Sequence, residues 1–381
     1  MRTGICLILF GLILCSGIEA QQTTNSKGGK QSAVNTLTTK QISDGWIQLF
    51  DGTTDYGWKP RGEAKWIVAD GVLVSEPGPP GALCTATEFS NGDLHFECAH
   101  GPAGDAGVAV HAPAEVMIDP KNAPTFNFSA GSTRWTSYDL IINGDSIDLH
   151  VNGKSSGVFN RKYTGRGYIG LLTDGKGTVQ YRNIRFQPTG LKTVFNGKDL
   201  TGWIAPEGNK SVFSVTKEGW LNLKGGRGDL QTIEQWGDFV LQIDVYSNGD
   251  HLNSGVFFRA EAGKFEQGYE DQIRNEWQGE DRTKPVDYGT GAVYNRLPVR
   301  KVVSSDREWF TMTLIAHGTH IGSWVNGVLV CDFTDTRPPD QTNARKGART
   351  KAGVISLQGH EPATDLNFRN IRIVELPPAG K

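Results

Sequence analysis

The sequence has few cysteines and no strong charge of either sign. Five cysteines occur among 381 residues, none in a Cys-x-x-Cys pair, so a zinc site is not expected. The formal net charge is −2, which gives the chain no electrostatic reason to bind nucleic acid or an anionic membrane. The 48 glycines and 17 prolines follow no Gly-X-Y period, which excludes collagen and is typical of a turn-rich β-protein.

Long apolar runs are also lacking, except at the N-terminus. Arg2 precedes an apolar run over 5–14 that is too short to span a bilayer, and small residues follow it. This pattern predicts a signal peptide over 1–20. A lipid anchor at Cys15 is not expected, because Leu14 stands where a lipoprotein signal carries a small residue. The mature protein is therefore expected to be exported, periplasmic or extracellular, without a membrane span, after a flexible leader over 21–43.

Export would permit disulfide bonds. Cys84 and Cys98 flank a turn at 90–92 at near-equal distances. If the flanking segments pair as a hairpin, the two side chains could face each other and form a disulfide. Two unlinked buried thiols are the alternative.

An internal repeat is the most informative feature of the sequence. Five sequence blocks occur twice in the same order. The first set begins at Phe50, Ala106, Trp135, Val151 and Tyr181, and the second at Phe195, Ser254, Trp309, Val325 and Phe368. The repeat predicts two copies of one domain, over 44–188 and 191–376.

Each copy has the pattern of antiparallel β-structure. Segments such as 238–245 and 311–315 are short, β-branched or aromatic, and roughly alternating. Asn-Gly pairs at 143–144, 152–153 and 326–327 indicate tight hairpins. No long helical pattern appears, so the sequence predicts an all-β fold of two tandem sandwiches or jelly rolls, whose faces or rim loops hold ligands.

The second copy is longer than the first. The offset between the copies grows from 148 at Gly107/Gly255 to 174 at Trp135/Trp309, a gain of 26 residues. A further 13 residues enter near 334–348. Long loops added to a β-scaffold tend to carry binding or catalysis, so the site is expected in the second copy; a surface insertion without function is the alternative.

Six segments of the second copy carry a resemblance to a known family. They are FNGKDLTGW at 195–203, NSGVFFR at 253–259, YEDQI at 269–273, GAVY at 291–294, LQGH at 357–360 and FRNI at 368–371. Together they resemble the 3-keto-disaccharide hydrolase family, also described as 3-keto-glucoside lyase and hydratase domains, and the first copy resembles it more weakly. The resemblance implies concanavalin A-like jelly-roll sandwiches, bacterial export and action on sugars oxidised at C3, supplied by a sugar 3-oxidase or dehydrogenase.

That chemistry assigns roles to four residues. A ketone at C3 acidifies the proton on C2, so a base can remove it, the C1 oxygen is expelled and water adds back. Glu270 is the predicted base and Arg259 the predicted partner of the enediolate oxygen. Tyr294 or His360 is expected to protonate the departing oxygen. The alternatives are an Arg259–Glu270 ion pair between strands, a packing role for Tyr294 and a plain loop position for His360.

Five further residues are predicted to bind substrate. Gln272 and Gln358 would hold sugar hydroxyls and Trp277 would stack on a ring face, and the set is completed by Asp271 and Asn253. If 269–277 is extended, alternate residues from Glu270 to Glu276 share one face. No cofactor is predicted; acidic residues in the added loops could hold Ca²⁺, but no EF-hand spacing is present.

The first copy departs from this residue set. His111 replaces Arg259 and Glu115 matches Glu270, whereas other positions lose their polar groups. The first copy has Ala114 in place of Tyr269 and Met117 in place of Gln272. It has Leu172 in place of Gln358 and Asp174 in place of His360. The first copy is therefore predicted to be catalytically silent, with a binding or structural role.

Two other functions remain open from the sequence. One is a lectin-like binding protein without turnover. The other is a retaining glycosidase that uses Glu270 and Glu276. Six positions along a straight strand would put these two ~20 Å apart, whereas a retaining pair needs ~5–5.5 Å.

Overall fold

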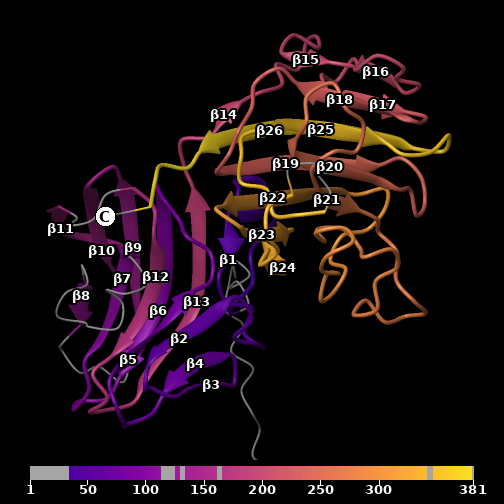
Figure 1. Cartoon of the computed structure of the whole chain (residues 1–381). Helices are drawn as coiled ribbons and strands as arrows, with labels where there is room; N and C mark the ends of the chain where they lie inside the picture. Colours follow the sequence, from indigo (N-terminus) through magenta and orange to yellow (C-terminus); the bar gives the residue numbers. More distant parts are fainter. Residues whose placement is uncertain (1–33, 113–124, 129–133, 161–164, 341–345, 380–381) are drawn as a thin grey trace, which may run out of the picture. The chain divides into compact units, whose positions relative to one another are not determined.

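Antiparallel strands make up almost all of the regular structure, as the alternating sequence pattern predicted (Figure 1). The computed structural model describes residues 34–112, 125–128, 134–160, 165–340 and 346–379. The predicted signal peptide lies outside these residues. In the described part of the chain the one helix is α1 (Thr39–Ser43), and no helix there has the length and apolar character needed to cross a bilayer.

The strands fall into two consecutive sets. Those of the first copy are β1 (Ile47–Gln48), β2 (Trp58–Gly62), β3 (Trp66–Ala69), β4 (Val72–Ser75), β5 (Gly81–Thr85), β6 (Gly92–His100), β7 (Ala106–Ala112), β8 (Thr125–Phe128), β9 (Thr136–Asn143), β10 (Ser146–Val151), β11 (Lys154–Asn160), β12 (Tyr168–Thr173) and β13 (Val179–Pro188). Those of the second copy are β14 (Lys192–Thr193), β15 (Trp203–Ile204), β16 (Val212–Val215), β17 (Leu221–Lys224), β18 (Gly228–Thr232), β19 (Phe239–Ser247), β20 (Ser254–Ala260), β21 (Tyr269–Ile273), β22 (Trp309–His317), β23 (His320–Val325), β24 (Val328–Thr334), β25 (Val354–Gly359) and β26 (Asp365–Glu375).

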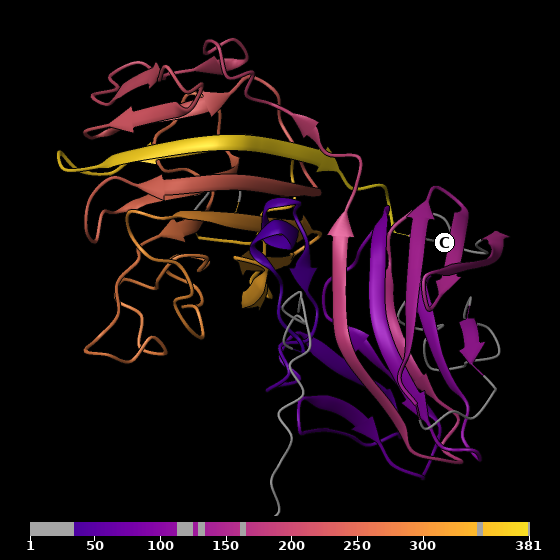
Figure 2. The ribbon, with the colours of Figure 1, turned by 180° about the vertical axis from the view of Figure 1, so that it is seen from behind.

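The two copies share one sheet topology. In the first, the order β11-β10-β9-β6-β13-β4-β3, with β1 beside β13, forms one sheet and β2-β5-β12-β7-β8 forms the other. In the second copy the same two orders recur from β14 to β26, and Figure 2 shows the long strand β26 beside its partner β19. The all-β prediction of two tandem jelly-roll sandwiches is confirmed.

Each sandwich buries an apolar core between its sheets. In the second copy, Leu241 and Ile243 of β19 pack in the same core as Val256 of β20 and Leu357 of β25. Alternate residues on each strand point to opposite sides, so the neighbours of these core residues face outward. At the predicted Asn-Gly hairpin of 326–327 both residues have positive φ, the conformation of a type I′ turn.

Residues 34–43 pack against the first sandwich. The sequence analysis had predicted that they belong to a flexible leader over 21–43. Asn35 is 8% exposed; its side-chain amide donates to the carbonyl of Gly71, and it exchanges hydrogen bonds with Asn183. Thr38 and Gln41 form a capping box at the start of α1. The leader prediction relied on missing apolar periodicity, but here one polar side chain and one cap hold the segment.

Cys84 and Cys98 are free, buried thiols. Cys84 lies on β5, which pairs with β2 and β12, whereas Cys98 lies on β6, which pairs with β9 and β13. The turn between them therefore leads from one sheet to the other and is not a hairpin, so the disulfide hypothesis is wrong. Burial raises the pKa of each thiol to about 12, which keeps both in the unreactive protonated form at neutral pH.

Candidate active site

The outer side of the second five-stranded sheet carries polar side chains, and we call it the polar face. The pairing register puts Asp229 opposite Gln358, Gln231 opposite Ser356, and Phe257 opposite Glu270. The inner side of the same strands carries core residues such as Leu230 and Leu357. The polar face consists of Asp229, Gln231, Gly255, Phe257, Glu270, Gln272, Ser356 and Gln358.

Three amide side chains at the polar face are held by carboxylates. Gln272 and Asn253 donate to Asp287 Oδ2 at 3.0 and 2.9 Å, and Gln358 donates to Glu266 Oε1 at 3.0 Å. A carboxylate accepts only, so each NH₂ group must face it. The three amide oxygens are buried and have no hydrogen-bond partner among the described residues. Each unsatisfied acceptor costs about 1–3 kcal/mol, so a ligand that donates hydroxyl protons would fit here.

Glu270 and Tyr294 line a common cavity of about 50 Å³, together with Phe257, Gly268, Tyr269, Asn295 and Arg296. A volume of this size holds one or two water molecules, so it fits an oxygen atom of a substrate and not a whole sugar ring. A Cβ on Gly255 would lie 2.5 Å from Glu270 Oε1. Glycine at this position therefore lets the carboxylate fold across β20, over the polar face.

Arg259 is not part of this cavity. Its side chain is 0% exposed and donates to the carbonyls of Gly237, Gly318 and Arg349 at 2.6–2.7 Å and to Asp238 Oδ1 at 2.7 Å. Arg259 pairs with Asp238, in place of the Arg259–Glu270 ion pair that the sequence left open as the alternative to a catalytic role for Arg259. The strand register is irregular between Phe257 and Ala260, and Arg259 has φ +48°, which turns its side chain away from the polar face.

His360 and Trp277 are also separate from the Glu270 cavity. The register aligns Glu270 of β21 with Ser356 of β25, two strands away, and His360 lies four residues beyond Ser356. The distance from Glu270 to His360 along the sheet is therefore about 17 Å. The His360 ring lies 3.8 Å from the Glu361 carboxylate and is 40% exposed. The guanidinium of Arg282 covers the Trp277 ring at 4.0 Å, and Trp277 also packs on the core. Trp277 therefore has a structural environment.

Asp271 points to the inner side of the sheet, opposite to Glu270 and Gln272. It is 2% exposed, and Ser323 Oγ donates to its Oδ1 at 3.1 Å. Burial raises the pKa of Asp271 to about 8, although the Ser323 hydrogen bond lowers it. Strand alternation thus removes Asp271 from the substrate side, where the sequence prediction had placed it.

The contribution of Asp271 to stability is expected to decrease as the pH rises from 4 to 8, because folded Asp271 keeps a proton that the unfolded chain releases. Buried His317, whose pKa is lowered by desolvation to about 2, contributes in the opposite direction up to about pH 6.5. The folded pKa is about 8 against an ordinary value of 3.8, so the loss is on the order of 4 kcal/mol between pH 4 and pH 7. Asp271→Asn cannot ionise, so in urea unfolding its free energy of unfolding relative to wild type should rise between pH 4 and pH 7. Asp250→Asn, at an exposed ion pair with Arg307, is the control, and an Asp271→Asn profile parallel to wild type would contradict the assignment.

The sequence analysis missed Asp229, Gln231, Ser356 and Arg296. Burial raises the pKa of Asp229 to about 6, although the hydrogen bond from the backbone N–H of Glu266 lowers it. An available signal was the alternation Asp-x-Gln inside 228–232, where the first copy has Ala82 and Cys84. No group of three or more His, Cys, Asp or Glu side chains that could hold a metal ion occurs in the described segments.

The equivalent side of the first copy is apolar. Ala82, Cys84, Ala109 and Leu172 form a buried cluster there. In the first copy Thr125 is opposite Ala109, and in the second copy Glu270 is opposite Phe257, the equivalent of Ala109. Thr125 therefore takes the position of Glu270. The predicted match of Glu115 with Glu270 is therefore wrong; Glu115, Ala114 and Met117 lie outside the described residues, and Asn127 takes the position of Gln272.

Comparisons with known proteins find several that are similar to part of this chain. A curated 3-keto-disaccharide hydrolase of Bacteroides thetaiotaomicron is 28% identical over 127 residues, 27% of this chain and 44% of that protein, so the match spans less than half of the relative. A Parabacteroides distasonis structure, provisionally described as a glycosyl hydrolase, has a TM-score of 0.40 at 24% identity, over 49% of this chain and 94% of its own. Carbohydrate-binding module CBM66 of Bacillus subtilis has a TM-score of 0.33 at 15% identity, over 45% and 95%.

The family assignment comes from a match that covers both sandwiches. The sequence profile of the 3-keto-alpha-glucoside-1,2-lyase-like domain matches residues 45–187 and again residues 190–374. These two matches cover most of the chain and agree with the repeated strand topology. The chain therefore belongs to the family of 3-keto-alpha-glucoside-1,2-lyase-like domains and carries two tandem copies of that domain.

Proposed function

We propose that the C-terminal sandwich cleaves 3-keto-glucosides, including 3-keto-disaccharides, by elimination and rehydration. The observation that carries this proposal is the polar face. There, a carboxylate, a phenol and a guanidinium line one small cavity, beside three fixed amide oxygens that lack hydrogen-bond donors among the described residues. The family and the curated relative support the same chemistry.

Sugar hydroxyls would satisfy the orphaned amide oxygens. The carboxylates of Asp287 and Glu266 hold the NH₂ groups of Gln272, Asn253 and Gln358, so their oxygens are preorganised as acceptors. Preorganised acceptors lose little conformational entropy when a ligand binds. The amides would thereby fix the sugar ring on the polar face, with one edge at the mouth of the Glu270 cavity.

The cavity residues divide the reaction between them. Glu270 takes the proton from C2, the electron pair forms the C1–C2 double bond, and the C1–O bond breaks. Arg296 stabilises the negative charge that develops on the C3 oxygen, and Tyr294 gives its proton to the departing oxygen. Water then adds its oxygen to C1 and a proton returns to C2, so the sum of the two steps is hydrolysis.

Two of the sequence-based roles change in this proposal. Arg259 has its donors engaged in the interior, so Arg296 takes its place at the enediolate. His360 is about 17 Å from Glu270 along the register, so the proton donor is Tyr294. An oxidoreductase that acts at C3 of a sugar must supply the substrate.

The first copy is proposed to have no turnover of its own. Its positions corresponding to Asp229, Gln231 and Gln358 are Ala82, Cys84 and Leu172, which accept no hydroxyl protons in the manner of a carboxylate or an amide. It would contribute stability or binding to the enzyme.

Turnover in D₂O tests the proposed reaction. The full chain is incubated with a 3-keto-disaccharide, and the released 3-keto-hexose is analysed by mass spectrometry and NMR. Deuterium is expected at C2, because that carbon loses and regains a proton in each turnover. A reaction without enzyme measures spontaneous exchange next to the ketone, and the unoxidised disaccharide should not be cleaved.

Each alternative function gives a different result. Equal cleavage of the unoxidised disaccharide, with hydrogen retained at C2, would support a glycosidase. Binding of the 3-keto-disaccharide without product would support a lectin-like protein. Either outcome refutes the elimination route.

A further inference from the structure

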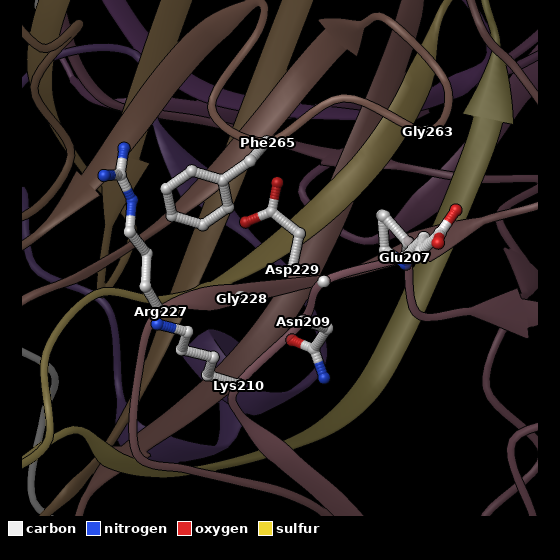
Figure 3. Close-up of a pocket in the computed structure, with 10 residues that line it drawn as sticks. Glu207, Asn209, Lys210, Arg227, Gly228, Asp229, Gly263 and Phe265 are labelled. Atoms are coloured by element: carbon white, nitrogen blue, oxygen red, sulfur yellow. The ribbon is translucent and has the colours of Figure 1, made fainter.

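A second, larger cavity lies beside Asp229 (Figure 3). Asp229 is on β18, which lies three strands from β21, the strand that carries Glu270. The cavity measures about 240 Å³. Three segments form it: the connection between β15 and β16 at 206–210, the start of β18 at 227–229, and the connection between β20 and β21 with Gly263 and Phe265. The three segments come from separate parts of the chain, and the fold brings them together around the cavity.

A buried carboxylate lies at the inner end of this cavity. Asp229 is 2% exposed, and its Oδ2 accepts the N–H of Glu266 at 3.2 Å. Ser356 and Gln231 lie near the carboxylate, yet its Oδ1 makes no hydrogen bond with the described residues. A carboxylate oxygen that accepts only and lacks a donor suits a hydroxyl group of a ligand.

The walls of the cavity fit a neutral ring. Two carboxylates, of Glu207 and Asp229, and two cations, of Lys210 and Arg227, line it, and Arg227 also pairs with Glu266 at 3.2 Å, so no excess of positive charge favours an anionic ligand. Phe265 supplies an aromatic ring; the Arg227 guanidinium covers one face of it at 4.4 Å from the centroid, so a ligand would contact the opposite face or the edge. An aromatic ring beside hydroxyl acceptors matches the apolar C–H face and polar edge of a pyranose.

We propose that this cavity is a distal sugar subsite, which binds an unoxidised pyranose unit of a substrate longer than a disaccharide. Along the register Asp229 lies three strands and two residues from Glu270, about 16 Å, too far for two adjacent rings. Gln358, which pairs with Asp229, offers an orphaned oxygen between the two positions. The predicted effect of the subsite on turnover rests on the proposed function. The predicted binding of a pyranose there does not.

The first copy provides an internal comparison. At the positions of Arg227 and Asp229 it has Pro80 and Ala82, so both the cation and the carboxylate are lost there. Gly228 is retained as Gly81. In the second copy a Cβ on Gly228 would lie 1.5 Å from Asn209 Oδ1, so this glycine lets the 206–210 connection approach the strand and close the cavity.

Saturation-transfer NMR of the full chain with methyl α- and methyl β-D-glucopyranoside tests binding without any turnover. Binding of at least one glucoside is expected in wild type and in Glu270→Gln. Asp229→Asn should weaken it about tenfold, the loss of roughly one hydrogen bond to a charged group. Phe265→Ala should weaken it by a similar factor, because it removes the apolar ring surface on which the pyranose packs. Asp250→Asn is the matched control and should bind as wild type does.

Kinetics with 3-keto-oligosaccharides of increasing length give the second readout. Phe265→Ala, at a residue that lies outside the polar face, should raise KM about tenfold for the longer substrate, leave kcat unchanged, and leave both constants unchanged for the 3-keto-disaccharide, since a remote subsite binds ground state and transition state equally. Glucoside binding that is absent in wild type, or insensitive to both Asp229→Asn and Phe265→Ala, would overturn the subsite. Binding without any 3-keto turnover would instead sink the proposed function and leave the subsite intact.

Discussion

Glu270→Gln is expected to lower kcat/KM for a 3-keto-disaccharide about 10²- to 10⁴-fold, the usual contribution of a positioned general base. Glutamine keeps the shape and the hydrogen-bonding length of the side chain but cannot accept the C2 proton. Because the amide oxygens that bind the sugar are unchanged, substrate affinity should remain close to wild type. Steady-state kinetics and a binding titration of the variant check both statements.

Glu276→Gln is the control for this experiment. Glu276 is bound by Arg274, whose Nε donates to Glu276 Oε2 at 2.8 Å, and it follows the end of β21. The elimination mechanism predicts that its substitution leaves turnover unchanged. A retaining glycosidase that used Glu270 and Glu276 together would lose activity in both variants. Wild-type activity in Glu270→Gln would show that another group removes the proton.

The repeat and the alternation of polar and apolar residues were sufficient to predict the fold. Five blocks in the same order required two copies of one domain, and the structure repeats the sheet order of the first copy in the second. Alternation also placed Glu270 and Gln272 on one side of 269–273. The pairing register has both on the polar face.

The predictions that differ from the structure involve departures from regular alternation. Counting by twos from Gly255 puts Arg259 beside Glu270, but the irregular register after Phe257 and the positive φ of Arg259 reverse its direction. Asp271 was chosen for its charge, although its position in the same count directs it inward. Residues on β25 share a side with the site, but His360 is too many residues beyond Ser356 to reach it.

The polar residues of β18 could have been predicted, and Arg296 could not. Asp229 and Gln231 alternate with Leu230 inside a strand, and their counterparts Ala82 and Cys84 are apolar, so the comparison of the two copies contained the signal. The position of Arg296 depends on how residues 274–308 fold between β21 and β22. That segment contains isolated bridges such as Val293–Leu297, which have no periodic sequence pattern.

Arg259→Met is expected to destabilise the protein by about 3–5 kcal/mol, the usual effect of removing one partner of a buried ion pair. The substitution keeps the length of the side chain but removes every donor, so three backbone carbonyls and Asp238 Oδ1 lose their bonds to the guanidinium. Asp238 would retain Arg166, whose Nη1 lies 3.0 Å from its Oδ2. A decrease of the melting temperature on the order of 10 °C should follow.

Arg307→Met separates this structural effect from the general loss of an arginine. Arg307 and Asp250 form an ion pair 56% and 65% exposed, and such exposed pairs contribute little to stability because water screens them. If Arg259 acts only in the interior, Arg259→Met measured well below its melting temperature should keep kcat near wild type while Arg307→Met changes neither quantity. A large loss of kcat in Arg259→Met without a lower melting temperature would return Arg259 to the enediolate, and would require the bulge after Phe257 to rearrange when substrate binds.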